Sequence, residues 1–284
     1  MKNIFLCAIS NIASGSCNED CGFCAQSARW KADIERYKAK PIETIVNEAK
    51  AAKNAGAVGF CLVTAGKGVT DQTLEFVCQA ARAVNAEKLE LKLIACNGTA
   101  TREQLRAMKQ AGVKAYNHNL ETSEKFYPQI CTTHGWKERY ETCLNANAEG
   151  LDLVCGGIFG LGESDADRED FLRSVKSLNP KTVPLNFFIA NPALPIQQPV
   201  MATDEALFWV RRSREVLGEK RRIMLAGGKE QAFGGRLMEA VEAGANALVV
   251  GNYLTTTGME SRALHDQLKN AGYQIADPKN CKGE

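Results

Sequence analysis

The chain has 284 residues, with 35 basic and 33 acidic side chains and a formal net charge of +2. So small a net charge provides no strong field to hold a nucleic acid or an anionic membrane, and small-molecule chemistry becomes the expected function. No stretch approaches 18 consecutive apolar residues, and the opening MKNIFLCAIS lacks the length and cleavage site of a signal peptide, so we expect a cytoplasmic protein. Eleven cysteines in a reducing compartment favour metal-bound thiolates over disulfides.

Apolar segments of strand length alternate with longer amphipathic segments along nearly the whole chain. Strands are expected at residues 3–10, 57–63, 89–96, 113–120, 151–160, 182–190, 221–226 and 245–251. Helices between them are expected at residues 42–56, 71–84, 101–112, 136–150, 164–178, 203–217 and 233–244. Repeated β-then-α units joined by right-handed crossovers predict an α/β fold, a (β/α)8 barrel of the TIM type. An open doubly wound sheet has the same periodicity, so the pattern alone leaves it open.

The chain has no Pro- or Ser-rich linker, and it repeats a structural unit rather than a sequence. We therefore expect a single barrel domain over residues 1–272 and a C-terminal tail over residues 273–284. In a parallel barrel the active site lies in the loops that leave the carboxyl ends of the strands, so functional residues are expected there.

Three cysteines lie in the loop after the first expected strand, in the segment CNEDCGFCAQS at residues 17–27. The spacing of Cys17, Cys21 and Cys24 allows a compact loop to direct three thiolates to one cuboidal iron–sulfur cluster, which leaves the fourth iron open to a cofactor or substrate. Structural zinc sites normally have four protein ligands, so zinc would need a remote fourth ligand here. Such a site and a chance clustering of cysteines are the alternatives.

With the aromatic Phe23 before the last cysteine, this segment resembles the signature of the radical S-adenosylmethionine (radical SAM) enzymes. The resemblance implies that the methionine part of S-adenosylmethionine binds the open iron. It also implies that one electron from the cluster releases a 5′-deoxyadenosyl radical. The barrel expected from periodicity supports the resemblance, because that fold suits this family.

Three further segments resemble the biotin synthase family: YNHNLET at residues 116–122, CTTHGWKERYET at 131–142 and GGIFGLGE at 156–163. The similarity runs from about Cys7 to Thr257. It implies a radical SAM sulfurtransferase that converts dethiobiotin to biotin with sulfide from an auxiliary iron–sulfur cluster. The rival functions are another radical SAM barrel enzyme, such as a hydrogenase-maturase-like enzyme or a lyase, and a metal-binding protein without radical chemistry.

The resemblance also assigns residues to the cofactor. Asn119 and Glu121 would hold the ribose of S-adenosylmethionine, although the family usually has aspartate where this chain has Glu121. Ile158 would pack against adenine, where Gly157 lets the backbone approach closely. Glu163 completes the expected cofactor-binding set, or it belongs to a helix-entry turn.

The expected substrate contacts are two amides, since Asn117 and Asn186 would hydrogen-bond the ureido ring of dethiobiotin. Neutral amides suit a urea, which offers donors and acceptors and carries no charge. Strand alternation places Asn117 and Asn119 on one face, with His118 opposite. No side chain is expected to be catalytic beyond the cofactor ligands.

In the common form of the family the auxiliary cluster is bound by cysteines from strands two, three and five and an arginine from strand seven. Cys61 matches the first of these positions, and Cys96 lies two residues beyond the second, on the same face of its strand. Cys155 lies one residue beyond the third, which reverses its face unless the following glycines permit a bulge. The candidate ligands are Cys61, Cys96, Cys131, Cys155 and Arg222.

Each candidate thiol has an alternative as a buried free cysteine that behaves as a small hydrophobe. Lys229 and Glu230 are expected either to contact the substrate or cofactor or to form a plain salt bridge. Arg139 is expected either to reach a carboxylate of the substrate or cofactor or to lie on a helix surface. The remaining cysteines are expected to be structural or exposed thiols: Cys7, Cys78, Cys143 and Cys281.

The expected cofactors are a [4Fe–4S] cluster, S-adenosylmethionine and an auxiliary iron–sulfur cluster, either [2Fe–2S] or a variant. The expected partners are dethiobiotin, an electron donor of the flavodoxin or ferredoxin type and a second copy of the chain in a homodimer. No nucleic acid and no membrane is expected.

Overall fold

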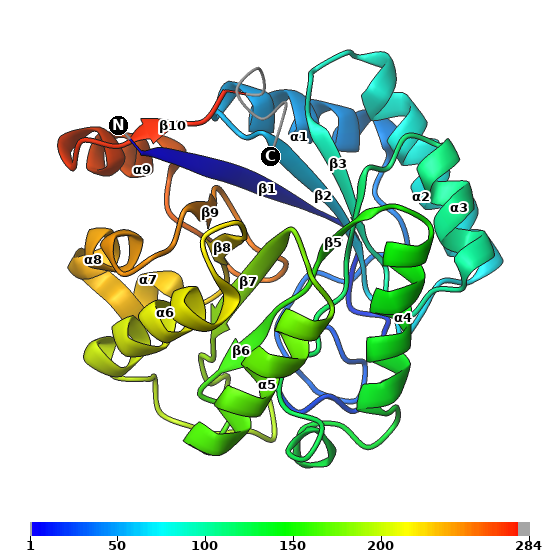
Figure 1. The fold of residues 1–284 in the computed structure, drawn as a ribbon. Helices are drawn as coiled ribbons and strands as arrows, with labels where there is room; N and C mark the ends of the chain where they lie inside the picture. Colours follow the sequence, from blue (N-terminus) through cyan, green and yellow to red (C-terminus); the bar gives the residue numbers. More distant parts are fainter. Residues whose placement is uncertain (1, 278–284) are drawn as a thin grey trace.

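The strands of the protein run parallel to one another around a common centre (Figure 1). The structure is a computed structural model in which residues 2–277 are described. The strands are β1 (Asn3–Ala13), β2 (Gly59–Thr64), β3 (Lys92–Cys96), β4 (Ala115–Asn117), β5 (Asp152–Val154), β6 (Gly157–Phe159), β7 (Thr182–Phe187), β8 (Arg222–Leu225), β9 (Ala247–Val249) and β10 (Gln274–Ile275).

The order of the strands shows that the sheet closes on itself. Neighbouring strands pair in the order β1, β2, β3, β4, β5, β7, β8 and β9, and β9 pairs in turn with β1, where Ala247 lies opposite Phe5. An open doubly wound sheet would leave two edges unpaired. The closed ring confirms the predicted TIM-type barrel.

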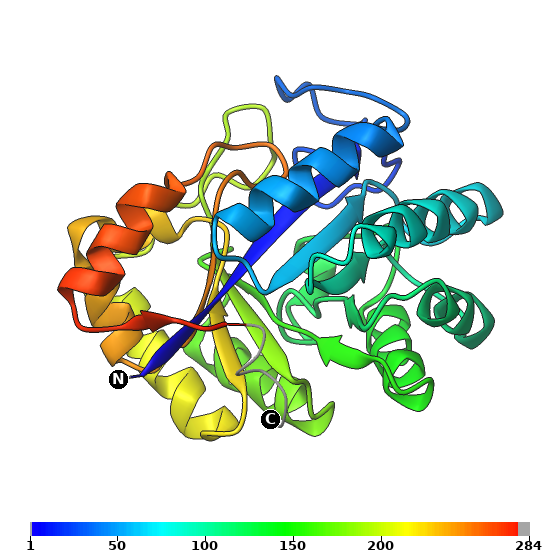
Figure 2. The ribbon, with the colours of Figure 1, turned by 90° about the horizontal axis from the view of Figure 1, so that it is seen from above.

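Helices cover the outside of the barrel, and α1 lies along β1 (Figures 1 and 2). Their boundaries follow local capping signals, since Thr101 and Ser164 each accept a hydrogen bond from the first turn of the helix that follows. No helix among the described residues is both long and apolar enough to cross a bilayer. The helices are α1 (Ile42–Asn54), α2 (Asp71–Ala86), α3 (Arg102–Gln110), α4 (Trp136–Ala148), α5 (Asp165–Ser177), α6 (Thr203–Leu217), α7 (Lys229–Phe233), α8 (Leu237–Glu242) and α9 (Ser261–Asn270).

The expected fifth strand, residues 151–160, is divided in the structure. β5 and β6 occupy one place in the ring, because both pair with β7. Between them Gly156 passes so close to β7 that a Cβ atom on it would lie 1.8 Å from the Pro184 carbonyl oxygen. Sequence periodicity does not report such a close approach of two backbones, so it could not locate the break.

Replacing Gly156 by alanine should therefore destabilise the barrel by about 2–3 kcal/mol, because backbone atoms rather than a flexible side chain must move to accommodate the methyl group. Gly135→Ala is the matched control, since nothing lies within 4 Å of the Cβ it would add. Thermal and urea unfolding followed by circular dichroism measure the difference. Equal stability of the two variants would contradict the close packing described above.

The C-terminal segment departs from the expected tail over residues 273–284. Gln274 and Ile275 form β10 and pair with Asn3 and Ile4 at the start of β1 (Figure 1). Residues 278–284, which include Cys281, lie outside the described residues.

The expected helix at residues 233–244 also differs from the structure. There α7 and α8 are separated by a single turn of 3-10 helix at Gly234–Arg236.

Alternate strand residues divide the apolar core into two clusters. The larger cluster joins the strands to the helices. The smaller cluster lies inside the ring of strands, and two of its members are thiols. Its buried members are Cys7, Cys61, Val63, Ile94, Ala115, Val154, Met224, Ala226, Ala247 and Val249.

Candidate active site

A cavity of about 360 Å³ lies between the three-cysteine loop and the interior of the barrel. One end is formed by the loop after β1, where Phe23 and Cys24 lie, and by the loop after β9, where Leu254 lies. The other end reaches Cys7 on β1. The cavity is thus at the carboxyl ends of the strands, where parallel barrels have their active sites.

The three-cysteine loop is held by backbone hydrogen bonds. The Ala28 amide donates to the Cys17 carbonyl at 2.7 Å, and the Cys24 amide donates to the Cys21 carbonyl at 3.1 Å. The indole nitrogen of Trp30 also donates to the Cys21 carbonyl, at 3.0 Å. Burial, together with the nearby Cys17, raises the pKa of Cys24 to about 11. The loop therefore holds three half-buried thiols near enough to interact electrostatically, which fits a shared iron–sulfur cluster.

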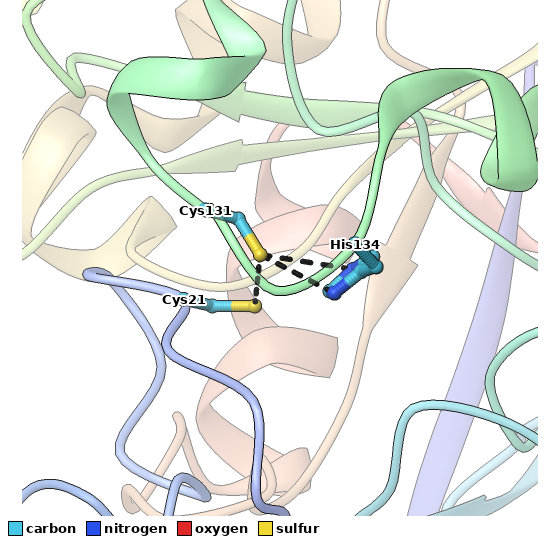
Figure 3. Close-up of side chains that lie close together, drawn as sticks. All are labelled: Cys21, Cys131 and His134. Carbon is cyan, nitrogen blue, oxygen red and sulfur yellow. Dashed lines mark hydrogen bonds between the residues drawn. The ribbon is translucent and has the colours of Figure 1, made fainter.

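Cys131 lies against this loop rather than in the barrel floor. Its sulfur is 3.6 Å from the sulfur of Cys21 and 3.3 Å from Nδ1 of His134, and Figure 3 shows the three side chains pointing toward one another. The hydrogen bond with Cys21 lowers the pKa of Cys131 to about 4 and raises that of Cys21. The structure thus places Cys131 apart from the residues that line the cavity.

Two acidic residues of the three-cysteine loop hold the segment that carries Cys131. Asp20 accepts hydrogen bonds from the backbone amides of Thr132 and Thr133, at 2.9 and 3.2 Å, and from both hydroxyl groups. Glu19 contacts Nδ1 of His134 at 2.7 Å. Although burial alone would raise it, these hydrogen bonds hold the pKa of Asp20 well below its usual range. The segment therefore supports the three-cysteine loop from one side.

The residues expected at the cofactor form a buried polar group. Asn119 and Glu121 both line the cavity, and the Asn119 amide nitrogen donates to Glu121 at 3.3 Å. Arg139 donates from one nitrogen to Glu121 at 3.1 Å and from another to the Asn119 carbonyl at 2.6 Å. Burial raises the pKa of Glu121, and the guanidinium of Arg139 opposes that effect. Arg139 thus faces inward, not outward from the helix surface.

The GGIFGLGE segment supplies one cavity residue and one residue of a turn. Ile158 lines the cavity, and Gly157 lies so near the Glu121 carbonyl that a Cβ atom would be 2.4 Å from its oxygen. Glu163 instead accepts hydrogen bonds from the Gly160 and Leu161 amides, at 2.8 and 2.6 Å, and from Arg168 at 2.7 Å. The structure places Glu163 in the helix-entry turn, and it does not line the cavity.

The two amides expected at the substrate also line the cavity. Asn186 is held on both sides, because its oxygen accepts from the Gly227 amide at 2.9 Å and its nitrogen donates to the Gly157 carbonyl at 3.0 Å. The side-chain oxygen Oδ1 of Asn117 is buried and has no hydrogen-bond partner among the described residues. His118 is buried on the opposite face of the segment, as strand alternation predicted.

The candidates for the auxiliary cluster separate clearly. Cys61 and Cys96 line the cavity. Cys155 faces the helices instead, with its sulfur 3.8 Å from that of Cys143 on α4, because it directly follows Val154, whose side chain lines the cavity. Arg222 lies over the ring of Phe5 at the amino end of the barrel, 4.0 Å from its centre. The structure therefore brings Cys61 and Cys96 to the cavity and does not bring Cys131, Cys155 or Arg222.

The chain matches the Radical SAM superfamily over residues 11–175 and the Biotin and Thiamin Synthesis associated domain over residues 184–274. It is 56% identical to a biotin synthase of Sulfurovum sp. (strain NBC37-1) over 275 aligned residues, and this alignment covers 97% of this chain and 96% of that protein. It is also 56% identical to a biotin synthase of Nautilia profundicola, over 98% of this chain and 99% of that protein. The chain belongs to the biotin synthase family of radical SAM enzymes.

Solved structures share the fold of this biotin synthase family member at low identity. Methylornithine synthase (PylB) has a TM-score of 0.80 at 17% identity, with 98% of this chain and 85% of that chain covered. The FeFe-hydrogenase maturase HydG from Carboxydothermus hydrogenoformans has a TM-score of 0.81 at 17% identity, with 99% and 70% covered. The barrel is thus shared with a hydrogenase maturase, while the full-length identity lies with biotin synthases.

Two features of the site were not expected from the sequence. Cys7, expected to be a structural or exposed thiol, lines the cavity from β1. Tyr253 lines it as well, and its hydroxyl donates to Glu230 at 2.9 Å beside the buried ammonium group of Lys229. Lys229 and Glu230 form the ion pair considered in the sequence analysis, at 2.7 Å. Inward alternation along the first strand was the one signal that could have identified Cys7.

Proposed function

We propose that this member of the biotin synthase family inserts sulfur into dethiobiotin to form biotin, with the sulfur taken from an auxiliary iron–sulfur cluster in the barrel. The observation that carries the proposal is a single cavity with Cys24 at one end, Cys61 and Cys96 at the other, and the amides of Asn117 and Asn186 on its walls. A substrate in this cavity would lie between two sets of thiolates. Membership of the radical SAM superfamily implies a [4Fe–4S] cluster and S-adenosylmethionine.

The residues of the loop fit the first of these groups. Cys17, Cys21 and Cys24 would bind the cluster with three thiolates, which would leave one iron free for S-adenosylmethionine. When bound, the [4Fe–4S] cluster and S-adenosylmethionine would supply a 5′-deoxyadenosyl radical for hydrogen abstraction from dethiobiotin, and the auxiliary cluster would supply the sulfur. The chain itself has to bind, orient and exclude water.

Glu121 is suited to hold the ribose of the cofactor. Its carboxylate is buried beside the cavity and is oriented by Asn119 and Arg139, so it can accept hydrogen bonds from ribose hydroxyl groups. Its backbone has a positive φ of 68°, an unusual conformation for a residue with a side chain. Ile158 offers an apolar surface for adenine on the same wall.

The amides are suited to hold the ureido ring. The free carbonyl oxygen of Asn117 can accept from a urea N–H, and the fixed orientation of Asn186 limits the positions that the ring can take. Apolar side chains such as Val63, Ile94 and Met224 line the rest of the cavity. Such a wall excludes water, which protects a reactive carbon radical, and it fixes the reacting atoms near one another.

Anaerobic incubation of the reconstituted protein with S-adenosylmethionine, a strong reductant and dethiobiotin tests the proposal. We expect both 5′-deoxyadenosine and biotin as products. Formation of 5′-deoxyadenosine without biotin would reject the proposed substrate and leave the radical chemistry in place. Iron and sulfide analysis completes the test. If each chain holds only enough iron for one cluster, the auxiliary cluster is rejected.

Replacing Asn117 by leucine should raise the KM for dethiobiotin about 10- to 100-fold, since an apolar side chain of similar shape leaves the urea without its acceptor in a buried site. The affinity for S-adenosylmethionine is the internal control and should remain within about twofold, because the cofactor contacts are assigned to Asn119 and Glu121. Steady-state kinetics with each ligand varied in turn measure both. An unchanged KM for dethiobiotin would contradict the role of Asn117.

The finer partner assignments stay predictions from the family resemblance. They are a flavodoxin- or ferredoxin-type electron donor and a homodimer. The type of the auxiliary cluster, [2Fe–2S] or a variant, belongs with them.

A further inference from the structure

Three thiols on adjacent strands line the inner end of the cavity: Cys7 on β1, Cys61 on β2 and Cys96 on β3. These strands lie side by side in the barrel (Figure 1). Their register makes the arrangement diagonal, since Ile9 lies opposite Cys61 and Val63 lies opposite Cys96. Cys61 therefore lies two residues beyond Gly59, the residue of β2 opposite Cys7. Cys96 likewise lies two residues beyond Ile94, the residue of β3 opposite Cys61.

The space between Cys7 and Cys61 is kept open by a glycine. Gly59 lies opposite Cys7 on β2, two residues before Cys61. A Cβ atom on Gly59 would lie 3.2 Å from the sulfur of Cys7, closer than most side chains allow. No side chain on β2 therefore separates the two thiols, and the Cys7 sulfur occupies the place that such a side chain would take.

Electrostatics also connect the three thiols. Burial raises the pKa of Cys7 to about 12. The contact with Cys96 raises the pKa of Cys61, and the nearby Cys7 raises it as well. The same contact lowers the pKa of Cys96. Among the described residues that line the cavity there is no lysine, arginine or histidine, and the charge of Arg139, which lowers the pKa of Cys96, is opposed by that of Glu121. An iron–sulfur core would supply the missing positive charge.

We propose that Cys7 is a ligand of the auxiliary iron–sulfur cluster, which Cys7, Cys61 and Cys96 bind together at the inner end of the cavity. The assignment rests on the proposed function and gives the cluster a ligand set drawn from three consecutive strands. It also brings the cluster to the substrate, because the amide nitrogen of Asn117 lies 3.5 Å from the Cys96 sulfur. A purely structural thiol would instead be closely packed among apolar side chains on the helix side, as Cys143 is.

Iron and sulfide analysis of the full chain, reconstituted anaerobically, tests the ligand set. Cys7→Ser nearly preserves the volume of the side chain but replaces a thiolate with a poor iron ligand. We expect this variant to keep about four irons and the formation of 5′-deoxyadenosine, and to lose all iron beyond those four. Cys78→Ser is the matched control, because Cys78 is an equally buried thiol on the outer helix α2, and it should keep all of its iron.

A second measurement counts the iron of the auxiliary cluster alone, in a protein that cannot bind the radical cluster. In a variant with Cys17, Cys21 and Cys24 all replaced by alanine, the remaining iron should be lost on adding Cys7→Ser and kept on adding Cys78→Ser. Circular dichroism establishes that the variants are folded. Full iron retention by Cys7→Ser, or no iron at all in the triple alanine variant, would overturn the proposal. If Cys7→Ser loses this iron but the unaltered chain itself forms no biotin from dethiobiotin, the ligand set stands and the proposed substrate is rejected.

Discussion

Replacing Cys24 by alanine should abolish the formation of 5′-deoxyadenosine and remove about four irons per chain. Cys24 is the one of the three loop cysteines that lines the cavity, so its loss leaves two thiolates for the cluster and removes a ligand on the substrate side. A cluster held by two thiolates lacks the site geometry that reserves one iron for the cofactor. We therefore expect loss of the cluster itself and not only slower chemistry.

Cys24 gives a sharper test than Cys21. The sulfur of Cys131 lies 3.6 Å from that of Cys21, so a second thiol is close enough to replace Cys21 as a ligand. No such substitute contacts Cys24 among the hydrogen bonds of the described residues. Cys21→Ala should accordingly retain more iron than Cys24→Ala. The double variant Cys21→Ala/Cys131→Ala should lose that remainder.

Iron analysis, electron paramagnetic resonance of the reduced protein and quantification of 5′-deoxyadenosine measure these effects. Cys78→Ala is the control for loss of a thiol and should match the unaltered chain, because Cys78 lies on the outer helix α2. If Cys24→Ala retained four irons and cleaved S-adenosylmethionine at the original rate, the three-cysteine loop would not be the radical cluster site.

The sequence predicted the parts of the fold that depend on local periodicity. The expected helix at residues 203–217 coincides with α6 (Thr203–Leu217), and the expected helix at 136–150 differs from α4 (Trp136–Ala148) only at its end. These segments have a regular apolar face and clear boundaries, which the sequence expresses directly. The break between β5 and β6 depends on a neighbouring strand that is distant in sequence, so a single-sequence pattern could not report it.

The residues of the candidate site likewise fall into those that local sequence predicts and those that depend on the fold. The spacing of the loop cysteines is local, and the three asparagines assigned from the family resemblance, Asn117, Asn119 and Asn186, line the cavity. The ligands of the auxiliary cluster depend on which face of a strand each residue occupies. A displacement of one residue turns Cys155 toward α4, while the placement of Cys131 depends on a long loop that packs against Asp20. The sequence predicts a structural or exposed thiol at Cys7, because a single thiol in an apolar strand resembles any other core residue.

The second large effect is expected at Arg139, whose replacement by alanine should destabilise the protein by about 3–5 kcal/mol. Arg139 and Glu121 are paired at 3.1 Å, and their side chains are only 13% and 10% exposed. Removing the guanidinium leaves a buried carboxylate without its partner, and it also frees the Asn119 carbonyl. The pKa of Glu121, already raised by burial, should then rise further, because Arg139 opposes that shift.

Loss of Arg139 should therefore weaken cofactor binding as well as stability. A protonated Glu121 accepts fewer hydrogen bonds from ribose hydroxyl groups, so the dissociation constant for S-adenosylmethionine should rise about tenfold or more. Arg102→Ala is the matched control, since Arg102 pairs with Glu149 on the surface and is 53% exposed. That variant should lose no more than about 1 kcal/mol and bind the cofactor normally.

A double variant separates the loss of the pair from the exposure of an unpaired charge. Arg139→Gln/Glu121→Gln replaces both charges with neutral groups, so it should be more stable than Arg139→Ala in urea unfolding, although its affinity for the cofactor stays low. Equal stability of Arg139→Ala and Arg102→Ala would show that the buried carboxylate does not need its partner. In that case Glu121 would already be protonated in the unaltered protein, and Arg139 would act only through the Asn119 carbonyl.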